Sequence, residues 1–510
     1  MNSFNFIHYG GRFSGAAPDI ISLWQPATIQ EELTVRRCIW FLASFVILPA
    51  QLFAQSREGK IDALLQKYFE YDQFTGSALV AEEGTIILKK GYGCANLEWG
   101  IPNAPDTKFR LGSITKQFTS MLVMQQVEKG SISLDTPVAA YLPDYPKPQG
   151  EKVTIRHLLT HTSGIPNYTG IIDIRTDRKR YTLEQLVGTF SGKPLEFEPG
   201  TRWKYSNSGY VLLGAVLEKV TRTPYERLLQ SNILHPLGMK NTGYDHSEEI
   251  LPKRAAGYER TGRIVNAPFI DMSVPFSAGA LYSTVEDLLL WDRGLYTGGL
   301  LSDSLKKVCF TPVLNNYAFG WVVQKRPIGS SSDSALFVYH GGGINGFNTI
   351  IARIPARQQL IVLLNNTGNA PLDEIVRSIA GILYDRPYAG PRQSIAHLLG
   401  ESIGKVGVAK ALEKYAGMIA HTGEYSLDES EMNILGYQLL QGGKTKEAIE
   451  VFKLNVAAFP KSWNVYDSLG EAYMKDGEKD LAIANYEKSL ELNGSNSGAV
   501  EALKKLKGAP

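Results

Sequence analysis

The sequence predicts an α/β (α+β) fold, in which helices flank an antiparallel sheet, followed by an all-α repeat module. An amphipathic helix and a β-hairpin occupy residues 61–88, and strands rich in aromatic and β-branched residues lie between positions 317 and 364. A 34-residue repeat begins after position 428. We therefore expect a main domain over residues 55–388, a linker and degenerate helical region over 389–428, and repeats with a capping helix over 429–510.

The elements of the main domain follow from the spacing of its apolar residues. Residues 61–69 have helical periodicity, while 76–81 and 85–88 are typical of two strands joined by the glycine-containing turn at 82–84. Apolar side chains at mixed three- and four-residue spacing indicate a largely buried helix over 114–127. Further helices are expected at 183–190, 208–220 and 284–295, and further strands at 317–323, 335–339, 349–352 and 360–364.

The C-terminal repeat is visible as pairs of similar residues 34 positions apart. Leu435-Gly436, Ala448-Ile449 and Phe452 recur as Leu469-Gly470, Ala482-Ile483 and Tyr486. This period and pattern resemble tetratricopeptide repeats. Residues 497–507 are expected to form a capping helix, and 406–415 a degenerate repeat. Such a module either stabilises its neighbour or offers a groove to a protein partner, and both roles remain open.

Composition excludes several classes of protein. The 510 residues suffice for two or three domains, and 44% of them are hydrophobic, as in a soluble globular protein. The formal net charge of +2 gives no electrostatic basis for nucleic-acid binding. No Cys/His cluster has metal-ligand spacing, so we expect no metal or cofactor. Cys94 and Cys309 are interpreted as two buried thiols, with a disulfide as the alternative.

Residues 36–54 have the pattern of a secretory signal peptide. Arg36-Arg37 precede a short apolar run, and Ala54 supplies a small residue at a cleavage site. The run is short for a membrane span, and an uncleaved anchor is the alternative. We expect residues 1–35 not to belong to the natural protein, with translation starting near Val35. The signal predicts an exported protein, periplasmic or secreted.

One stretch of the main domain carries candidate chemistry, residues 109–120 with Ser113-x-x-Lys116. If a helix starts near Ser113, Lys116 lies one turn later on the same face, and both polar groups meet at a helix N-terminus. A hydroxyl that must lose its proton and attack a carbonyl benefits from both features. The same spacing also occurs at Ser304 and Ser402, and an ordinary N-cap serine is the alternative interpretation.

Two later stretches complete a signature. Residues 203–209 contain Tyr205-x-Asn207, and residues 338–346 contain His340 followed by three glycines. In this order the three motifs resemble those of the serine β-lactamase and penicillin-binding-protein superfamily. The tyrosine in the second motif is similar to the class C β-lactamase branch, which includes esterases, D-aminopeptidases and DD-peptidases. The resemblance extends over about residues 60–385, with further similar phrases at 158–164 and 278–284. It implies an antiparallel sheet flanked by a helical subdomain.

The resemblance also implies a role for each residue. Ser113 would be the nucleophile, Tyr205 the general base, and Lys116 its electrostatic and proton-shuttling partner. Asn207 would orient Lys116 and bind a substrate amide or carbonyl, and the backbone N–H groups of Ser113 and Gly343 would form the oxyanion hole. The residue types alone leave the base open, because a desolvated lysine would also serve.

Each motif residue also has a purely structural interpretation. Tyr205 could be a core tyrosine, Asn207 a helix N-cap residue, and His340 a loop histidine without a catalytic role. For His340 we expect a mostly uncharged side chain at neutral pH that gains its proton as the pH falls toward 6. Where many β-lactamases place a permanently charged lysine, such a histidine favours uncharged acyl groups over anionic antibiotics.

The sequence therefore predicts an exported serine hydrolase that acts on small-molecule esters, amides or peptides through an acyl-enzyme on Ser113. A true β-lactamase or a DD-peptidase acting on peptidoglycan is the first alternative. The second is a non-catalytic scaffold that recruits partners through its repeats, although intact Ser113, Lys116 and Tyr205 speak against it.

Overall fold

The computed structural model describes residues 56–260 and 264–508. The predicted leader, signal peptide and alternative anchor lie outside these residues. Within the described residues, none of the helices has the length and apolar character needed to cross a membrane.

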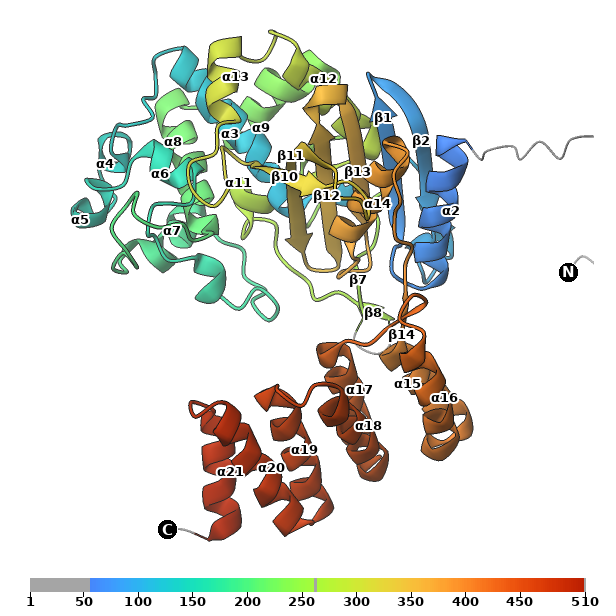
Figure 1. Cartoon of the computed structure of the whole chain (residues 1–510). Helices are drawn as coiled ribbons and strands as arrows, with labels where there is room; N and C mark the ends of the chain where they lie inside the picture. Colours follow the sequence, from blue (N-terminus) through green and yellow to red (C-terminus); the bar gives the residue numbers. More distant parts are fainter. Residues whose placement is uncertain (1–55, 261–263, 509–510) are drawn as a thin grey trace, which may run out of the picture. The chain divides into compact units, whose positions relative to one another are not determined.

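A six-stranded antiparallel sheet forms the centre of the main domain, and it confirms the predicted fold class (Figure 1). The N-terminal hairpin joins the sheet beside the last strand, because Gly76 pairs with Asn365 and Glu82 with Gln359. The sheet order is β10-β11-β12-β13-β1-β2. Its strands are β1 (Gly76–Glu82), β2 (Thr85–Tyr92), β10 (Val322–Pro327), β11 (Ser334–Ile344), β12 (Phe347–Ile354) and β13 (Gln359–Asn365).

The two faces of the sheet bury different hydrophobic clusters. On β1, Ala78 and Val80 pack in a cluster with α2 (Arg57–Glu70) and α14 (Leu372–Leu383). Leu79 and Ala81 contribute to the larger cluster on the other face, with most of the remaining helices. This division follows from the pleat, which points successive side chains to opposite faces. The sheet is therefore a buried middle layer between two layers of helix.

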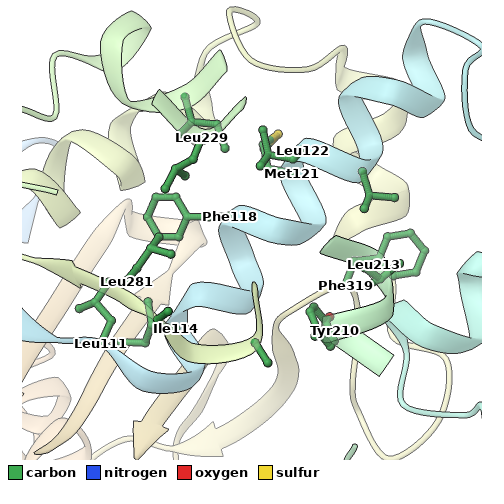
Figure 2. Close-up of a cluster of buried hydrophobic side chains, with 14 of the residues drawn as sticks. Leu111, Ile114, Phe118, Met121, Leu122, Tyr210, Leu213, Leu229, Leu281 and Phe319 are labelled. Atoms are coloured by element: carbon green, nitrogen blue, oxygen red, sulfur yellow. The ribbon is translucent and has the colours of Figure 1, made fainter. Parts of the chain in front are cut away.

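The larger cluster surrounds the predicted buried helix. This helix is α3 (Thr115–Glu128), and the 3₁₀ turn η1 (Gly112–Ile114) directly precedes it. Figure 2 shows Phe118 and Leu122 of α3 in one cluster with Leu281, Leu229 and other side chains. Burial on all sides fixes the start of α3, and with it the position of Ser113.

The other elements of the main domain are further helices and several small strands. The helices predicted at 183–190, 208–220 and 284–295 are confirmed as α7 (Leu183–Ser191), α8 (Asn207–Thr221) and α12 (Val285–Tyr296). The remaining helices are α4 (Val138–Tyr141), α5 (Lys147–Gly150), α6 (Ile155–Leu159), η2 (Tyr168–Gly170), α9 (Tyr225–Leu229), η3 (Gln230–Leu234), α10 (His235–Leu237), α11 (Phe276–Gly279), α13 (Asp303–Cys309) and η4 (Pro355–Arg357). The small strands are β3 (Cys94–Asn96), β4 (Ile101–Pro102), β5 (Phe109–Arg110), β6 (Gly243–Tyr244), β7 (Tyr258–Arg260), β8 (Ile264–Asn266) and β9 (Leu281–Ser283).

Two expectations for the main domain need correction or completion. The strand predicted at 317–323 is wrong over most of its length, because β10 begins only at Val322. Gly320 has a φ of 77°, and its Cα lies so close to Lys116 that an added Cβ would be 2.8 Å from the Lys116 carbonyl oxygen. The chain therefore turns against α3 before it enters the sheet. Cys94 and Cys309 are both free thiols, but only Cys309 is buried as expected, because Cys94 is partly exposed.

The C-terminal region is helical and forms two hydrophobic clusters. One joins α15 (Ile395–Val406) and α16 (Val408–Ala420) to α17 (Glu429–Gln441), and the other involves α17 to α21. Helices α17 and α19 begin at positions 429 and 463, and α18 and α20 at 445 and 479, so both pairs repeat after 34 residues. The other elements are α18 (Thr445–Ala458), α19 (Trp463–Asp476), α20 (Lys479–Leu492), α21 (Ser497–Lys507), β14 (Gln393–Ser394) and β15 (Tyr425–Ser426).

Candidate active site

Ser113 lies in η1, where the chain passes against the edge of β11. Gly112 has a φ of 54°, which favours glycine, and an added Cβ there would lie 2.8 Å from the backbone nitrogen of Gly343. The hydroxyl of Thr349 donates a hydrogen bond to the carbonyl of Leu111 (2.8 Å). These contacts hold the backbone of Ser113 beside that of Gly343, while the Ser113 side chain remains partly exposed.

Lys116 points at Ser113 from the first turn of α3. Its Nζ lies 3.0 Å from Ser113 Oγ, 2.8 Å from Asn207 Oδ1 and 2.7 Å from the carbonyl oxygen of Ala278. The lysine side chain is fully buried, and this burial holds its pKa well below the usual value. A neutral amine has two hydrogens and one lone pair.

The three contacts of Lys116 Nζ determine where the two hydrogens and the lone pair of a neutral amine would point. The Ala278 carbonyl and the Asn207 side-chain oxygen can only accept hydrogen bonds, so they take the two amine hydrogens. In the neutral amine the lone pair then faces the Ser113 hydroxyl, whereas in the ammonium form Nζ donates its third hydrogen to Ser113 Oγ. Burial favours the neutral form of Lys116, in which the site presents the serine O–H to a nitrogen base.

Tyr205 contacts Ser113 from the opposite side. The Tyr205 hydroxyl donates a hydrogen bond to Ser113 Oγ (2.8 Å), and Lys116 Nζ lies 4.9 Å from the centre of the tyrosine ring. Desolvation of the hydroxyl raises the pKa of Tyr205 far above its ordinary value, so the phenol keeps its proton at neutral pH. In this state Tyr205 is a proton donor, whereas the resemblance had implied a general base.

Asn207 is the first residue of α8 and connects two parts of the site. Its side-chain oxygen accepts from Lys116, and its backbone N–H donates to Asn167 Oδ1 (3.1 Å). The predicted N-cap position falls on Ser206 instead, whose side chain makes no capping hydrogen bond. The side chain of Asn207 is therefore free to hold the lysine.

His340 lies on β11 but is almost completely buried, with 5% of its surface exposed. The Gly341 carbonyl lies 2.6 Å from Nδ1 and can only accept, so Nδ1 carries the hydrogen and Nε2 accepts from the Tyr317 hydroxyl (2.9 Å). Burial and then the nearby Lys116 lower the pKa of His340 to about 3. The expectation that His340 gains a proton near pH 6 is therefore wrong.

Three parts of this site carried no recognisable signal in the sequence. Ala278 contributes only its backbone carbonyl. Asn167 is a loop residue whose side chain accepts from Asn207. Tyr317 lies in a segment that the sequence predicts as a strand. By contrast, the structure brings Ser113, Lys116, Tyr205 and Asn207 into one hydrogen-bonded network. It also places Gly343 beside the turn of Ser113.

The neighbouring glycines of β11 should respond differently to alanine. A Cβ on Gly342 would lie 1.9 Å from the Leu111 carbonyl oxygen, whereas a Cβ on Gly343 would meet nothing within 4 Å. We expect Gly342→Ala to cost about 1–3 kcal/mol of unfolding free energy through overpacking. We expect Gly343→Ala to change that free energy by less than about 0.5 kcal/mol. Denaturant unfolding measures both, and equal losses would contradict the close approach of Leu111.

Comparison with known proteins agrees with this arrangement. A family model described as Beta-lactamase matches residues 61–384. Penicillin-binding protein 4* of Bacillus subtilis (strain 168) is 32% identical over 369 residues, covering 66% of this chain and 79% of that protein. The octameric penicillin-binding protein homologue from Pyrococcus abyssi superposes with a TM-score of 0.58 at 28% identity, covering 64% of this chain and 78% of that one.

A solved D-stereospecific amidohydrolase from Streptomyces sp. is also similar. It has a TM-score of 0.51 and 25% identity, and the match covers 63% of this chain and 97% of that one. The matches share one fold, and the family model spans most of the main domain described above. The chain belongs to the β-lactamase family, within the superfamily of serine hydrolases that includes the penicillin-binding proteins.

Proposed function

We propose that this protein hydrolyses esters or amides of small molecules through an acyl-enzyme on Ser113. One observation carries the proposal: Ser113 Oγ lies between Lys116 Nζ and the hydroxyl of Tyr205, at 3.0 and 2.8 Å. A serine needs such an adjacent base to act as a nucleophile at neutral pH. Mass spectrometry after incubation with a fluorophosphonate tests the proposal, because the reagent should add to Ser113.

Acylation begins when Lys116 Nζ takes the proton of the Ser113 hydroxyl. Ser113 Oγ then forms a bond to the substrate carbonyl carbon, and the N–H groups of Ser113 and Gly343 stabilise the resulting oxyanion. When the tetrahedral intermediate collapses, Tyr205 gives its hydroxyl proton to the leaving oxygen or nitrogen, and the carbonyl–leaving-group bond breaks. The Lys116 ammonium returns a proton to the phenolate, so both groups recover their starting states.

Deacylation repeats these steps with water as the nucleophile. Lys116 takes a proton from the water, whose oxygen attacks the acyl carbon, and the bond to Ser113 Oγ breaks. Tyr205 gives its hydroxyl proton to Ser113 Oγ, the Lys116 ammonium returns its proton to the phenolate, and the carboxylic acid leaves. Asn207 and the Ala278 carbonyl keep the lysine nitrogen aimed at the reacting oxygen throughout, which limits the reorganisation that each proton transfer requires.

The buried, uncharged His340 is the basis for a proposed substrate preference. The pKa of His340 is lowered to about 3, so this position supplies no positive charge for a carboxylate between pH 5 and 8. Substrates with neutral acyl groups therefore bind without the disadvantage that a positive charge at this position would give them relative to anionic substrates. The name of the Streptomyces enzyme fits amide substrates, whereas that of the Bacillus protein favours reaction with penicillins as a second candidate function.

We expect p-nitrophenyl butyrate to be hydrolysed with a higher kcat/KM than nitrocefin, by about tenfold or more, because one charge-assisted contact contributes about 1.5–3 kcal/mol. The ratio of the two kcat/KM values should stay constant from pH 8 to pH 5, since His340 remains neutral across that range. Paired kinetics across this pH range measure it. Efficient nitrocefin turnover would favour the second candidate function, and a ratio that changes sharply near pH 6 would show that His340 titrates there.

Export and the role of the repeats are further parts of the proposal. The signal-like residues 36–54 support a periplasmic or secreted location, and the 34-residue spacing of α17 to α20 supports a tetratricopeptide-like module. A protein partner for that module is compatible with either location.

A further inference from the structure

His161 lies directly behind the site, just after α6. It is buried, with 1% of its surface exposed, and its φ of 59° lies in the left-handed region. For a residue with a Cβ this conformation costs about 1–2 kcal/mol, so surrounding contacts must hold it. The proposed chemistry assigns no task to this residue.

The contacts of His161 bracket Tyr205. The His161 carbonyl accepts a hydrogen bond from the backbone N–H of Lys204 (3.0 Å), and its Nδ1 accepts from the backbone N–H of Ser206 (3.2 Å). Lys204 and Ser206 are the two chain neighbours of Tyr205. One residue therefore fixes the main chain on both sides of the tyrosine.

The protonation state of His161 is suited to this contact. Because Nδ1 accepts from an amide, the ring hydrogen must be on Nε2, and Nε2 has no hydrogen-bond partner among the described residues. Burial, the nearby Lys116 and His340 together hold the pKa of His161 well below its ordinary value. The neutral ring is therefore favoured, and in this form Nδ1 accepts the hydrogen bond from Ser206.

The imidazole also supports the tyrosine ring. Its centre lies 4.2 Å from that of Tyr205 and 4.5 Å from that of Tyr317. Tyr317 in turn donates to His340 on β11. The left-handed backbone of His161 thus directs one side chain against both Tyr205 of the second motif and Tyr317, the partner of His340.

We propose that His161 is a positioning residue, which holds the hydroxyl of Tyr205 on Ser113 Oγ through the backbone on both sides of Tyr205. The inference rests on the proposed function, because it assumes that Tyr205 takes part in the reaction. Displacing a reacting group by about 1 Å can cost about 10²-fold in rate. Loss of His161 should therefore lower kcat through Tyr205 while leaving KM nearly unchanged.

Two substitutions separate the hydrogen bond from the backbone conformation. Asparagine and glycine both tolerate a left-handed φ. Only asparagine has a side-chain acceptor, Oδ1, which is bonded to Cγ as Nδ1 is in histidine. We expect His161→Gly to lower kcat for p-nitrophenyl butyrate by about tenfold to a hundredfold, with KM within about twofold. We expect His161→Asn to restore kcat to within about threefold of wild type.

A double-mutant test decides whether the effect passes through Tyr205. In a Tyr205→Phe background, His161→Gly should lower kcat by less than about threefold more, because the hydroxyl it positions is already absent. Thr162→Val is the matched control, since it removes only the hydroxyl contact with Thr160 in the same buried loop. The end point of fluorophosphonate labelling counts folded active sites in every variant, so partial misfolding does not enter kcat.

The outcomes separate the two proposals. If the wild type is not labelled at Ser113, the proposed function fails. If it is labelled but His161→Gly keeps wild-type kcat per site, or loses a full tenfold more in the Tyr205→Phe background, the positioning role is overturned. A loss in His161→Asn as large as that in His161→Gly would likewise overturn the Nδ1 contact as its basis. An equal loss of kcat in Thr162→Val would also overturn the role of His161, because any disturbance of the loop would then lower the rate.

Discussion

Ser113→Ala is expected to abolish ester hydrolysis and fluorophosphonate labelling while leaving the chain folded. The side chain is partly exposed, and its removal takes away one partner each from Lys116 and Tyr205. Because each lost hydrogen bond contributes about 1 kcal/mol, the unfolding free energy should change only modestly. The rate should fall to background, because no other group in the network can form the acyl bond. Intact-mass spectrometry with peptide mapping measures the adduct, and p-nitrophenyl butyrate assays measure turnover.

The chain contains two internal controls for this prediction. Ser304 and Ser402 begin the other Ser-x-x-Lys matches, with Lys307 and Lys405, but the Ser304 hydroxyl contacts that of Ser302, and Lys405 pairs with Glu401. Among the described residues, no lysine nitrogen makes a hydrogen bond to either serine. Ser304→Ala and Ser402→Ala should therefore keep full labelling. An adduct on either residue in the wild type would contradict the assignment of the nucleophile.

The second large effect concerns the proton acceptor. We expect Lys116→Ala to lower kcat by about 10³ or more, and Tyr205→Phe by about 10², within the range for lost acid–base groups. The order follows from the network: Lys116 Nζ contacts Ser113 Oγ and burial favours its neutral form, while Tyr205 keeps its proton because desolvation raises its pKa. Single-turnover acylation rates measured with p-nitrophenyl butyrate give both values.

The pH dependence of acylation provides an independent check. Burial lowers the pKa of Lys116, so the amine is protonated and inactive only when the pH falls below that lowered value. The rate should decrease on the acid side and stay flat to about pH 9, where a base with an ordinary phenol pKa near 10 would still be gaining activity. An acylation rate that climbs steadily through pH 10, together with a larger loss in Tyr205→Phe than in Lys116→Ala, would instead make the phenolate the base.

The sequence was sufficient wherever periodicity or motif order reflects local structure. The hairpin at the start, the buried helix after Ser113 and the 34-residue helix pairs all follow from spacing that each segment determines for itself. The prediction for 317–321 failed because aromatic residues are typical of a strand, whereas here Tyr317 is buried against His161 and Tyr205 of the site. Gly320, whose positive φ turns the chain there, was the one local sign of it.

The rest of the site depends on contacts that no local pattern encodes. The carbonyl of Ala278 belongs to a residue without a functional side chain, and the neutral state of His340 depends on burial by elements distant in the sequence. The resemblance named the residues of the three motifs correctly as neighbours. It could not assign the protons among them, because the pKa values of Lys116 and Tyr205 depend on how completely each group is desolvated.

The pairing of β1 with β13 has a consequence for how the molecule is made. Positions 76 and 365 are partners, and β13 lies between β12 and β1 in the finished sheet. Closing so long a loop is slow, and the strand is synthesised after every motif residue. A growing chain that already carries Ser113, Lys116, Tyr205 and His340 would therefore lack the middle of its sheet, and hydrolytic activity would be among the last properties that the newborn protein acquires.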